Sequence, residues 1–285
     1  MNCHTMTEVT LEYLLSFVRE DAPSGDITTD AIIPHDTCCN AVIIAKQEGI
    51  ICGLAEAGRL FTHFGVWTTA AGPDGSHVNQ GDVVLSLTGN ASHILLLERT
   101  ALNIVGRMSG IATRTKFYMD CIRSTGSNCR VAATRKTSPG MRALDKKAVI
   151  LGGGDPHRYS LSDGILIKDN HLALVPLADA IASAKARSVY RKIEVEAEDP
   201  DSAVKAAEAG ADIILLDNMT PDMVVNTLKE LNARNLRLGR IIEVSGIINE
   251  DTIRSYAVPG VDVISIGALT HSVRNFDVSL EISKS

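Results

Sequence analysis

Basic residues gather between Thr134 and His171, although the 285-residue chain carries a net charge of -6. This segment reads TRKTSPGMRALDKKAVILGGGDPHRYSLSDGILIKDNH. Its basic side chains, set among several glycines, are Arg135, Lys136, Arg142, Lys146, Lys147, His157, Arg158 and Lys168. Arginine binds planar carboxylates and phosphates with a fixed fork, lysine supplies a mobile point charge, and glycine lets backbone N–H groups approach an anion. The segment therefore predicts a site for a small polyanion.

Three of these residues follow apolar runs. Arg135 and Lys136 come directly after VAAT, and Lys168 comes directly after GILI. A solvated basic face is the usual alternative for a run of charges. A position at the end of a buried strand favours a pocket instead.

Composition narrows the class of protein. The chain has 34 acidic and 28 basic residues and is 45% hydrophobic, which predicts a large buried core and no extended basic surface for nucleic acid. No apolar run reaches the roughly 20 residues that cross a bilayer, and MNCHTMTEV does not resemble a secretory signal. The six cysteines form no CxxC pair and no zinc-type spacing with histidine. We expect a cytoplasmic protein with reduced thiols, no membrane partner and no nucleic acid partner.

The first part of the chain is heterogeneous. Helical spacing of apolar residues predicts helices over Glu8–Glu20, Glu56–Phe64 and His93–Arg107. Short apolar runs bounded by turn residues predict strands over Ala41–Ala45, Ile50–Cys52 and Val83–Leu87. These elements predict a small sheet packed beside helices.

After Gly126 strands and helices alternate, which predicts a parallel sheet covered by helices. The predicted strands are Cys129–Thr134, Gly164–Ile167, Lys192–Glu196, Asp212–Asp217, Arg240–Ser245 and Val261–Ile266. The predicted helices are Met141–Leu151, Leu174–Ser188, Pro200–Ala209, Pro221–Leu231 and Glu250–Tyr256. A complete α/β barrel needs eight strands, so six predict an incomplete barrel or an open sheet.

Polar residues or glycine stand at all six predicted strand ends. Functional groups of parallel α/β proteins gather at the carboxyl ends of strands. The strand-end residues are, in order, Arg135 and Lys136, Lys168 and Asp169, Glu196, Asp217 and Asn218, Ser245 and Gly246, and Gly267. One such residue would mean little, but six in succession predict a site at this edge.

Motifs through nearly the whole chain resemble the quinolinate phosphoribosyltransferase family, the carboxylating nicotinate-nucleotide pyrophosphorylases. Besides the basic segment, they are GDITT (25–29), ERTALN (98–103), SGIAT (109–113), IEVE (193–196), LLDN (215–218) and GVDVISIGALTHS (260–272), in the family's order. The resemblance implies an N-terminal α/β sandwich domain over residues 1–112, to which residues 271–285 return. It also implies an incomplete α/β barrel over residues 113–270.

The resemblance implies that the phosphoribosyl group of 5-phosphoribosyl 1-pyrophosphate is transferred to quinolinate. Pyrophosphate and carbon dioxide are lost, and nicotinate mononucleotide forms for NAD biosynthesis. Both substrates are polyanions, as the basic segment requires. The ribose develops oxocarbenium-like charge that carboxylates stabilise, and the quaternised ring nitrogen serves as the electron sink for decarboxylation.

Site roles follow by resemblance. Arg135, His157 and Arg158 would bind the quinolinate carboxylates, with Lys136 and Lys168 neutralising charge beside them. Glu196 and Asp217 would lie near the ribose hydroxyls and Mg²⁺, which arrives mainly with the substrate. The remaining implied substrate contacts are Thr134, Asn170, His171, Ser245, Gly246, Ile247, Ile266, Gly267 and Ala268, of which the last six include the loops for the 5′-phosphate. The catalytic set is Lys136, Lys168, Glu196 and Asp217.

Two further expectations concern assembly and affinity. Arg99, in ERTALN, resembles a family arginine that reaches into a neighbouring subunit's site, which implies a homodimer with a shared site or a homohexamer. Ile247 stands where the family has a second glycine. A β-branched residue disfavours positive φ and would crowd a phosphate, so we expect Ile247 to affect binding of the phosphoribosyl donor.

Alternatives remain for several of these residues. Alone, Arg99 would be read as a surface arginine, His157 as a loop histidine, and Gly152–Gly154 as a flexible turn. Lys168 has a position suited to a Schiff-base lyase. A paralogue with another small-acid acceptor, or a non-catalytic relative that binds a pyridine acid, also fits the pattern.

Overall fold

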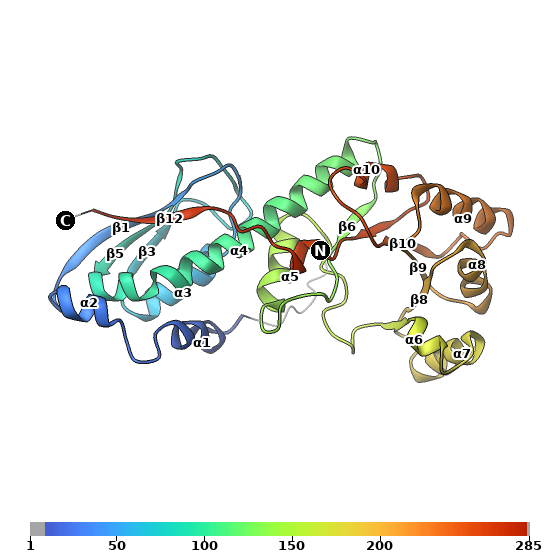
Figure 1. Ribbon diagram of the computed structural model, residues 1–285, viewed down its shortest axis with the longest axis horizontal. Helices are drawn as coiled ribbons and strands as arrows, with labels where there is room; N and C mark the ends of the chain where they lie inside the picture. Colours follow the sequence, from blue (N-terminus) through green and yellow to red (C-terminus); the bar gives the residue numbers. More distant parts are fainter. Residues whose placement is uncertain (1–8, 284–285) are drawn as a thin grey trace. The chain divides into compact units, whose positions relative to one another are not determined.

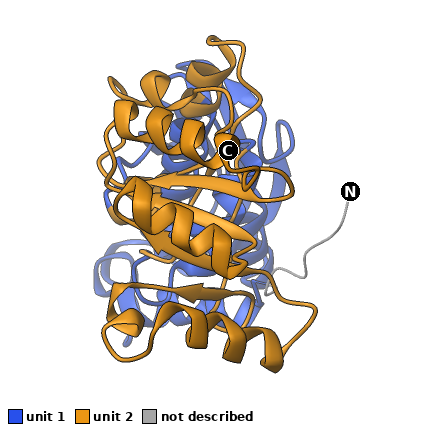
Figure 2. Ribbon diagram, turned by 90° about the vertical axis from the view of Figure 1, so that its right-hand side faces the viewer, with its two compact units in different colours: residues 1–116, 137–153, 272–285 blue, residues 117–136, 154–271 orange. Residues whose placement is uncertain are grey.

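A computed structural model describes residues 9–283 of the chain (Figure 1). The chain folds into two compact units. Unit 1 comprises residues 1–116, 137–153 and 272–285, and unit 2 comprises residues 117–136 and 154–271 (Figure 2). These units interleave along the sequence, so they do not test the domain limits predicted at residues 112 and 270, which stay a prediction. Residues 1–8, which include most of the segment inspected for a secretory signal, lie outside the described residues.

Unit 1 is built on an antiparallel sheet of order β12-β1-β5-β3. The strands of unit 1, inside and outside this sheet, are β1 (Cys38–Ala45), β2 (Gly49–Ile50), β3 (Trp67–Ala70), β4 (His77–Val78), β5 (Val83–Asn90) and β12 (Val278–Ser283). Its helices are α1 (Leu11–Asp21), α2 (Ile27–Ile32), α3 (Leu54–His63), α5 (Arg142–Leu151) and the first part of α4 (Ala91–Arg123). The C-terminal strand β12 pairs antiparallel with β1, as Figure 1 shows, so the chain ends in the unit where it begins.

Helix α4 is longer than the predicted helix, which ended at Arg107. The fold uses the glycines at 106 and 110 of this helix for close packing. A Cβ atom on Gly110 would overlap the Arg274 carbonyl oxygen. A Cβ atom on Gly106 would lie 3.0 Å from the Phe276 carbonyl oxygen. These glycines, one helical turn apart, give the returning C-terminal segment room to approach the helix.

Unit 2 contains six parallel strands in the order β6-β11-β10-β9-β8-β7. The strands are β6 (Arg130–Ala132), β7 (Ile165–Ile167), β8 (Ile193–Ala197), β9 (Ile213–Asp217), β10 (Ile241–Ser245) and β11 (Val263–Ser265). The helices are α6 (Asp169–Leu172), α7 (Leu177–Arg187), α8 (Pro200–Ala209), α9 (Pro221–Ala233), α10 (Ile253–Tyr256) and α11 (Ala268–His271). All six predicted strands and the mixed α/β class are confirmed, with two strands fewer than a closed barrel.

Apolar side chains on alternate strand positions pack against the helices of unit 2. Val195, Leu216 and Val244 belong to one buried cluster that also contains Ala207 of α8 and Leu228 of α9. The helix starts are fixed locally, because the Asp199 carboxylate accepts from Ser202 N at 2.7 Å ahead of α8. The opposite face of the strands carries the polar residues of the strand ends together with apolar residues such as Leu215.

Short elements account for most of the missed structure. The strands β3, β4 and β12 and the helices α2, α6 and α11 were not predicted. Each is six residues or shorter and lacks the continuous apolar run that marked the equally short strands of unit 2. The predicted first helix began at Glu8, which lies outside the described residues, and α1 begins at Leu11 after the Thr10 cap. No described helix is both long enough and apolar enough to cross a membrane.

Candidate active site

Strand register places the predicted acidic residues on one face of the unit 2 sheet. Glu196 of β8 lies beside Leu215 of β9, and Asp217 of β9 lies beside Ser245 of β10. Leu215 and Asp217 are two residues apart, and side chains two apart on a strand point to the same side. Glu196, Asp217 and Ser245 therefore share the face opposite the helix-packed core.

Lys168 joins this group through an ion pair. Its ammonium contacts the carboxylate of Glu196. The Glu196 side chain is 8% exposed and that of Lys168 is 43% exposed, so the pair lies at the rim of a buried region. Lys168 also precedes the short helix α6, where its backbone N–H donates to His171 Nδ1 at 3.0 Å. Asn170, in the same helix, is exposed. The predicted residues of the 168–171 segment are thus fixed by local hydrogen bonds at the strand end.

The ends of β9 and β10 form a tight junction. Asn218 Nδ2 donates to Asp217 Oδ2 at 2.8 Å, and Asn218 N donates to the Ser245 carbonyl at 3.0 Å. Gly246 has a φ of 125°, and a Cβ atom there would lie 2.6 Å from Asn218 Oδ1 and 2.9 Å from Asn218 N and Cα. Only glycine fits this position. Ile247 is not among the described non-glycine residues with positive φ, and it is 80% exposed. The backbone strain expected at Ile247 is therefore not present.

The ends of β6 and β11, which are neighbours in the sheet, also meet at this edge. Thr270 Oγ1 donates to the Lys136 carbonyl at 2.8 Å, and Lys136 N donates to Thr134 Oγ1 at 3.1 Å. A Cβ atom on Gly267 would lie 3.3 Å from Lys136 Cδ. Ile266 is 1% exposed within the core, so its side chain faces away from this edge. Ala268 is the first residue of α11.

The turn that carries His157 and Arg158 is anchored to β6. Asp155 N donates to the Val131 carbonyl at 2.7 Å, and the Asp155 carboxylate accepts from His157 N at 2.8 Å and from Arg130 at 2.8 Å. His157 adopts a positive φ of 56°, a conformation that costs a non-glycine residue about 1–3 kcal/mol and persists where the surroundings hold it.

Two buried glutamates that the sequence had not singled out lie against this turn. His157 Nε2 is 3.3 Å from Glu243 Oε1 and 4.0 Å from Glu194 Oε2. Burial, and next the charge of Glu243, raise the pKa of Glu194 to about 7. Burial likewise lowers the pKa of Arg158, with Arg135 adding to that effect and Glu194 and Glu243 opposing it. The alternating sequence IEVE does not say which way Glu194 faces, and only the register shows that it turns inward. A lone acid two residues before a strand-end polar residue, as in IEVE and IIEVS, was the available signal.

Several nitrogen and oxygen atoms here could serve an anion or a cation. Arg135 Nε is buried and has no hydrogen-bond partner among the described residues. His157, Glu194 and Glu243 offer ligand atoms that all lie within 4.8 Å of one another. Glu196 and Asp217 present carboxylate oxygens, the ligand type that Mg²⁺ prefers. The edge therefore combines cationic groups for a polyanion with carboxylates for a hard cation or a developing positive charge.

Not every residue of the basic segment belongs to this edge. Lys146 and Lys147 lie on α5 in unit 1, where Lys146 is 1% exposed and Lys147 contacts Glu56 at 2.6 Å. Their sequence neighbours suggested an anion site, but the helix turns them into the interior of unit 1. Arg142 donates to Thr137 Oγ1 at 3.0 Å in the same unit. Arg99 is exposed on α4 in unit 1, so its role in a neighbouring site stays a prediction.

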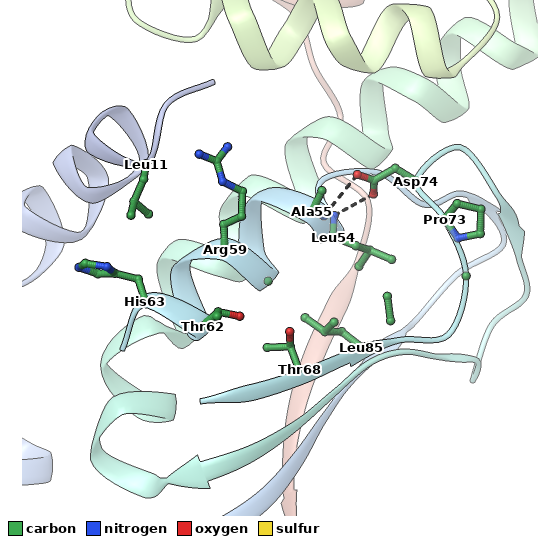
Figure 3. Close-up of a pocket in the computed structure, with 13 residues that line it drawn as sticks. Leu11, Leu54, Ala55, Arg59, Thr62, His63, Thr68, Pro73, Asp74 and Leu85 are labelled. Carbon is green, nitrogen blue, oxygen red and sulfur yellow. Dashed lines mark hydrogen bonds between the residues drawn. The ribbon is translucent and has the colours of Figure 1, made fainter. Parts of the chain in front are cut away.

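A separate cavity of about 580 Å³ lies in unit 1 between α1, α3 and the sheet (Figure 3). Arg59 and His63 of α3 line it with Leu11 and Leu85, and Asp74 accepts from the first backbone N–H groups of α3. The cavity contains none of the predicted site residues. We place the candidate site at the strand ends, where charged groups converge, rather than in this cavity.

Comparison with known proteins gives a consistent result over both halves of the chain. A family model for the quinolinate phosphoribosyl transferase C-terminal domain matches residues 111–281, and one for the N-terminal domain matches residues 26–109. A probable carboxylating nicotinate-nucleotide pyrophosphorylase of Methanothermobacter thermautotrophicus is 44% identical over 274 residues, which are 95% of this chain and 98% of that protein. One of Archaeoglobus fulgidus is 45% identical over 260 residues, 91% of this chain and 99% of that protein.

Solved structures agree. NadC from Streptococcus pyogenes is 36% identical, with a TM-score of 0.89 over 98% of this chain and 99% of that one. The nicotinate-nucleotide pyrophosphorylase from Ehrlichia chaffeensis is 32% identical, with a TM-score of 0.91 over 98% of this chain and all of that one (100%). On the strength of both family models and of these full-length relatives, the chain belongs to the quinolinate phosphoribosyl transferase family.

Proposed function

We propose that this protein is a carboxylating nicotinate-nucleotide pyrophosphorylase. It transfers the phosphoribosyl group of 5-phosphoribosyl 1-pyrophosphate to quinolinate, releases pyrophosphate and carbon dioxide, and forms nicotinate mononucleotide for NAD biosynthesis. One observation carries the proposal. In a member of this family, Lys168, Glu196 and Asp217 converge on the inner face of one parallel sheet, the face opposite the helix-packed core.

Charge explains how these residues serve the reaction. Arg135, His157 and Arg158 bind the two carboxylates of quinolinate, and Lys136 and Lys168 lower the electrostatic cost of bringing two polyanions together. The pyridine nitrogen attacks the anomeric carbon as pyrophosphate leaves, so positive charge develops on the ribose. The carboxylates of Glu196 and Asp217 stabilise that charge. Loss of the carboxylate next to the quaternised nitrogen then needs no protein base: the C–C bond breaks, carbon dioxide leaves, and the ring carbon keeps the electron pair and takes up a proton from solvent.

Backbone segments at Gly246 and Gly267 bind the 5′-phosphate of the donor. Gly246 leaves no side chain in the junction with Asn218, and the segment that begins at Gly267 runs directly beside Lys136. Backbone N–H groups at these two loops bind the 5′-phosphate. Asn170 and His171, next to Lys168, lie within the same strand-end segment and complete the substrate contacts together with Thr134.

Magnesium takes part as a substrate-associated ion. Glu196 and Asp217 fit this role because their oxygens share one face of the sheet at adjacent strand ends. When bound, the ion neutralises pyrophosphate as the leaving group. Chelation with EDTA should abolish turnover, and excess Mg²⁺ should restore it. Asp217→Asn should raise the Mg²⁺ concentration that gives half-maximal rate, whereas an unchanged Mg²⁺ dependence would contradict this role.

The active assembly is a homodimer in which Arg99 of one subunit serves the site of the other, and two or more dimers form a larger homo-oligomer such as a hexamer. Support comes from the ERTALN match and from the exposed position of Arg99 on α4. Mixing inactive Arg99→Ala and Arg135→Ala proteins should regain about a quarter of wild-type activity if subunits exchange at random in dimers. Failure to regain activity after confirmed exchange would contradict a shared site. A cytoplasmic location fits the free thiols of the described cysteines.

The direct test is product formation by the purified protein from quinolinate, 5-phosphoribosyl 1-pyrophosphate and Mg²⁺. Nicotinate mononucleotide and carbon dioxide should form together, and nicotinate as acceptor should give no product. Binding of quinolinate without products would favour a paralogue with another acceptor. Borohydride trapping at Lys168 with carbonyl substrates should give no adduct, because the Lys168 ammonium pairs with Glu196 and a Schiff base requires a neutral amine.

A further inference from the structure

Two glutamates with no part in the proposed reaction lie buried beneath the site. Glu194 is 5% exposed and Glu243 is 4% exposed. Register places both on the inner face, since Glu194 lies beside Ile213 and Glu243 beside Leu215 of β9. Buried carboxylates are costly unless cations or hydrogen bonds compensate for lost water. Their retention in the strands calls for nearby cationic partners.

The partners are the two residues of the 157–158 turn. His157 Nε2 approaches Glu243 Oε1 at 3.3 Å and Glu194 Oε2 at 4.0 Å. Arg158 interacts electrostatically with both carboxylates. Ser265 Oγ donates to Glu243 Oε1 and orients it. Glu194 Oε1 is buried without a hydrogen-bond partner among the described residues, so no hydrogen bond at that atom competes with His157 and Arg158.

The turn is held from its opposite side as well. Asp155 accepts from His157 N at 2.8 Å and is tied to Val131 of β6 at 2.7 Å. His157 keeps its φ of 56° under these constraints. A strained residue persists only where several contacts fix it. The buried acids and Asp155 together fix both the backbone and the side-chain direction of the turn.

We propose that Glu194 and Glu243 are positioning residues that fix His157 and Arg158 for the two carboxylates of the acceptor. This inference rests on the proposed function. A planar diacid needs cationic groups at a set separation, and a guanidinium or imidazolium held by a buried carboxylate loses little freedom when the acceptor binds. The same three ligand atoms could hold a metal ion, but Ser265 already donates to Glu243 and the charge of Arg158 acts on both carboxylates, which favours the role of counterion.

The test compares Glu243→Gln and Glu194→Gln with Glu198→Gln as a matched control. Gln keeps the size of the side chain and removes its charge, and Glu198 is an exposed glutamate just after the same strand as Glu194. Michaelis constants for quinolinate and for 5-phosphoribosyl 1-pyrophosphate are measured separately, with calorimetric binding of quinolinate and the thermal unfolding midpoint. Glu243→Gln should weaken quinolinate binding about tenfold or more, as expected for loss of a charged contact. The Michaelis constant for the donor should change less than about twofold, and Glu243→Asp should recover part of the loss.

A second variant keeps the test decisive if the glutamine variants unfold. Ser265→Ala removes the donor to Glu243 but leaves its charge, and it should raise the quinolinate Michaelis constant about threefold with an unchanged donor constant. Equal weakening of both substrates, or no change for quinolinate in folded Glu243→Gln or Ser265→Ala, would overturn the positioning role while leaving the proposed function intact. Wild-type protein that neither binds nor converts quinolinate would overturn both.

Discussion

Gly246→Ala tests whether contact with Asn218, at the junction between β9 and β10, constrains the loop that we propose binds the donor's 5′-phosphate. The glycine has a φ of 125°, where an L side chain is strained. An added Cβ would lie 2.6 Å from Asn218 Oδ1, which a side-chain rotation can relieve. It would also lie 2.9 Å from Asn218 N and Cα, which only a backbone shift can relieve.

The expected cost combines two effects. Unfavourable backbone conformation costs about 1–3 kcal/mol, and forcing an atom into a filled space costs about 1–3 kcal/mol more. Gly239 provides a matched control because it has a φ of 78° with nothing within 4 Å of the added Cβ. Gly239→Ala should therefore show the backbone effect alone, about 1–2 kcal/mol. Any gain from restricting the unfolded chain is common to both variants and cancels in the comparison.

Thermal unfolding followed by circular dichroism measures the difference, and steady-state kinetics measures the effect on the site. At about 2–4 °C per kcal/mol for a unit of this size, Gly246→Ala should melt about 5 °C below Gly239→Ala. Because the proposed function assigns the 5′-phosphate to this loop, the donor's Michaelis constant should rise in Gly246→Ala and stay unchanged in Gly239→Ala. Equal midpoints for the two variants would refute the claim that contact with Asn218 constrains this loop.

Four other outcomes are expected. Arg135→Ala should abolish use of quinolinate without lowering the unfolding midpoint, and unchanged turnover would contradict the carboxylate assignment. Ile247→Gly should lower the donor's Michaelis constant while costing at most about 1 kcal/mol of stability, because the isoleucine is 80% exposed; a higher constant would contradict crowding. Arg107→Met should cost about 3–5 kcal/mol at pH 7 in urea unfolding, since Asp145 is fully buried and its carboxylate accepts from Arg107 at 2.7 and 2.9 Å. Burial raises the pKa of Asp145, so the loss should shrink as the pH falls and the acid takes up a proton; a pH-independent loss would argue against a buried charge as the cause. The pKa of Glu194 is raised to about 7 from 4.5, so the folded chain holds its proton to higher pH than the unfolded chain, and the unfolding free energy should fall by up to about 3 kcal/mol as pH rises through that window; a slope unchanged by Glu194→Gln would count against it.

Elements marked by an apolar run or by a helical pattern could be predicted from the sequence. The six strands of unit 2 were found because each is an apolar run with a polar or glycine end, and the helix predicted over Pro200–Ala209 matches α8, whose start Asp199 and Pro200 fix. Helix α4 was predicted to end at Arg107, but it continues past glycines at 106 and 110. Their reason, close approach of residues 274–276, lies far away along the chain and leaves no local sign.

The basic segment shows the same limit at the site. Its charges predicted an anion site, and the strand-end residues Arg135, Lys136 and Lys168 do lie in unit 2. Lys146 and Lys147 have the same charge and the same neighbourhood in sequence, yet they are buried or paired in unit 1. Residue type could not separate the two groups, because the difference depends on which element each residue occupies and on what packs against it.

The sequence by itself determined the class of the fold, the strand ends that carry polar residues and, through motifs along the chain, the family. These depend on residue type and short spacing, which are local properties. Only the tertiary structure decided that Glu194 and Glu243 turn inward against His157, since that follows from the register between β8, β9 and β10 and from the turn anchored by Asp155. Register and burial arise from contacts between distant parts of the chain, so alternating residues such as Glu194, Glu196 and Glu198 acquire different roles only when the sheet is formed.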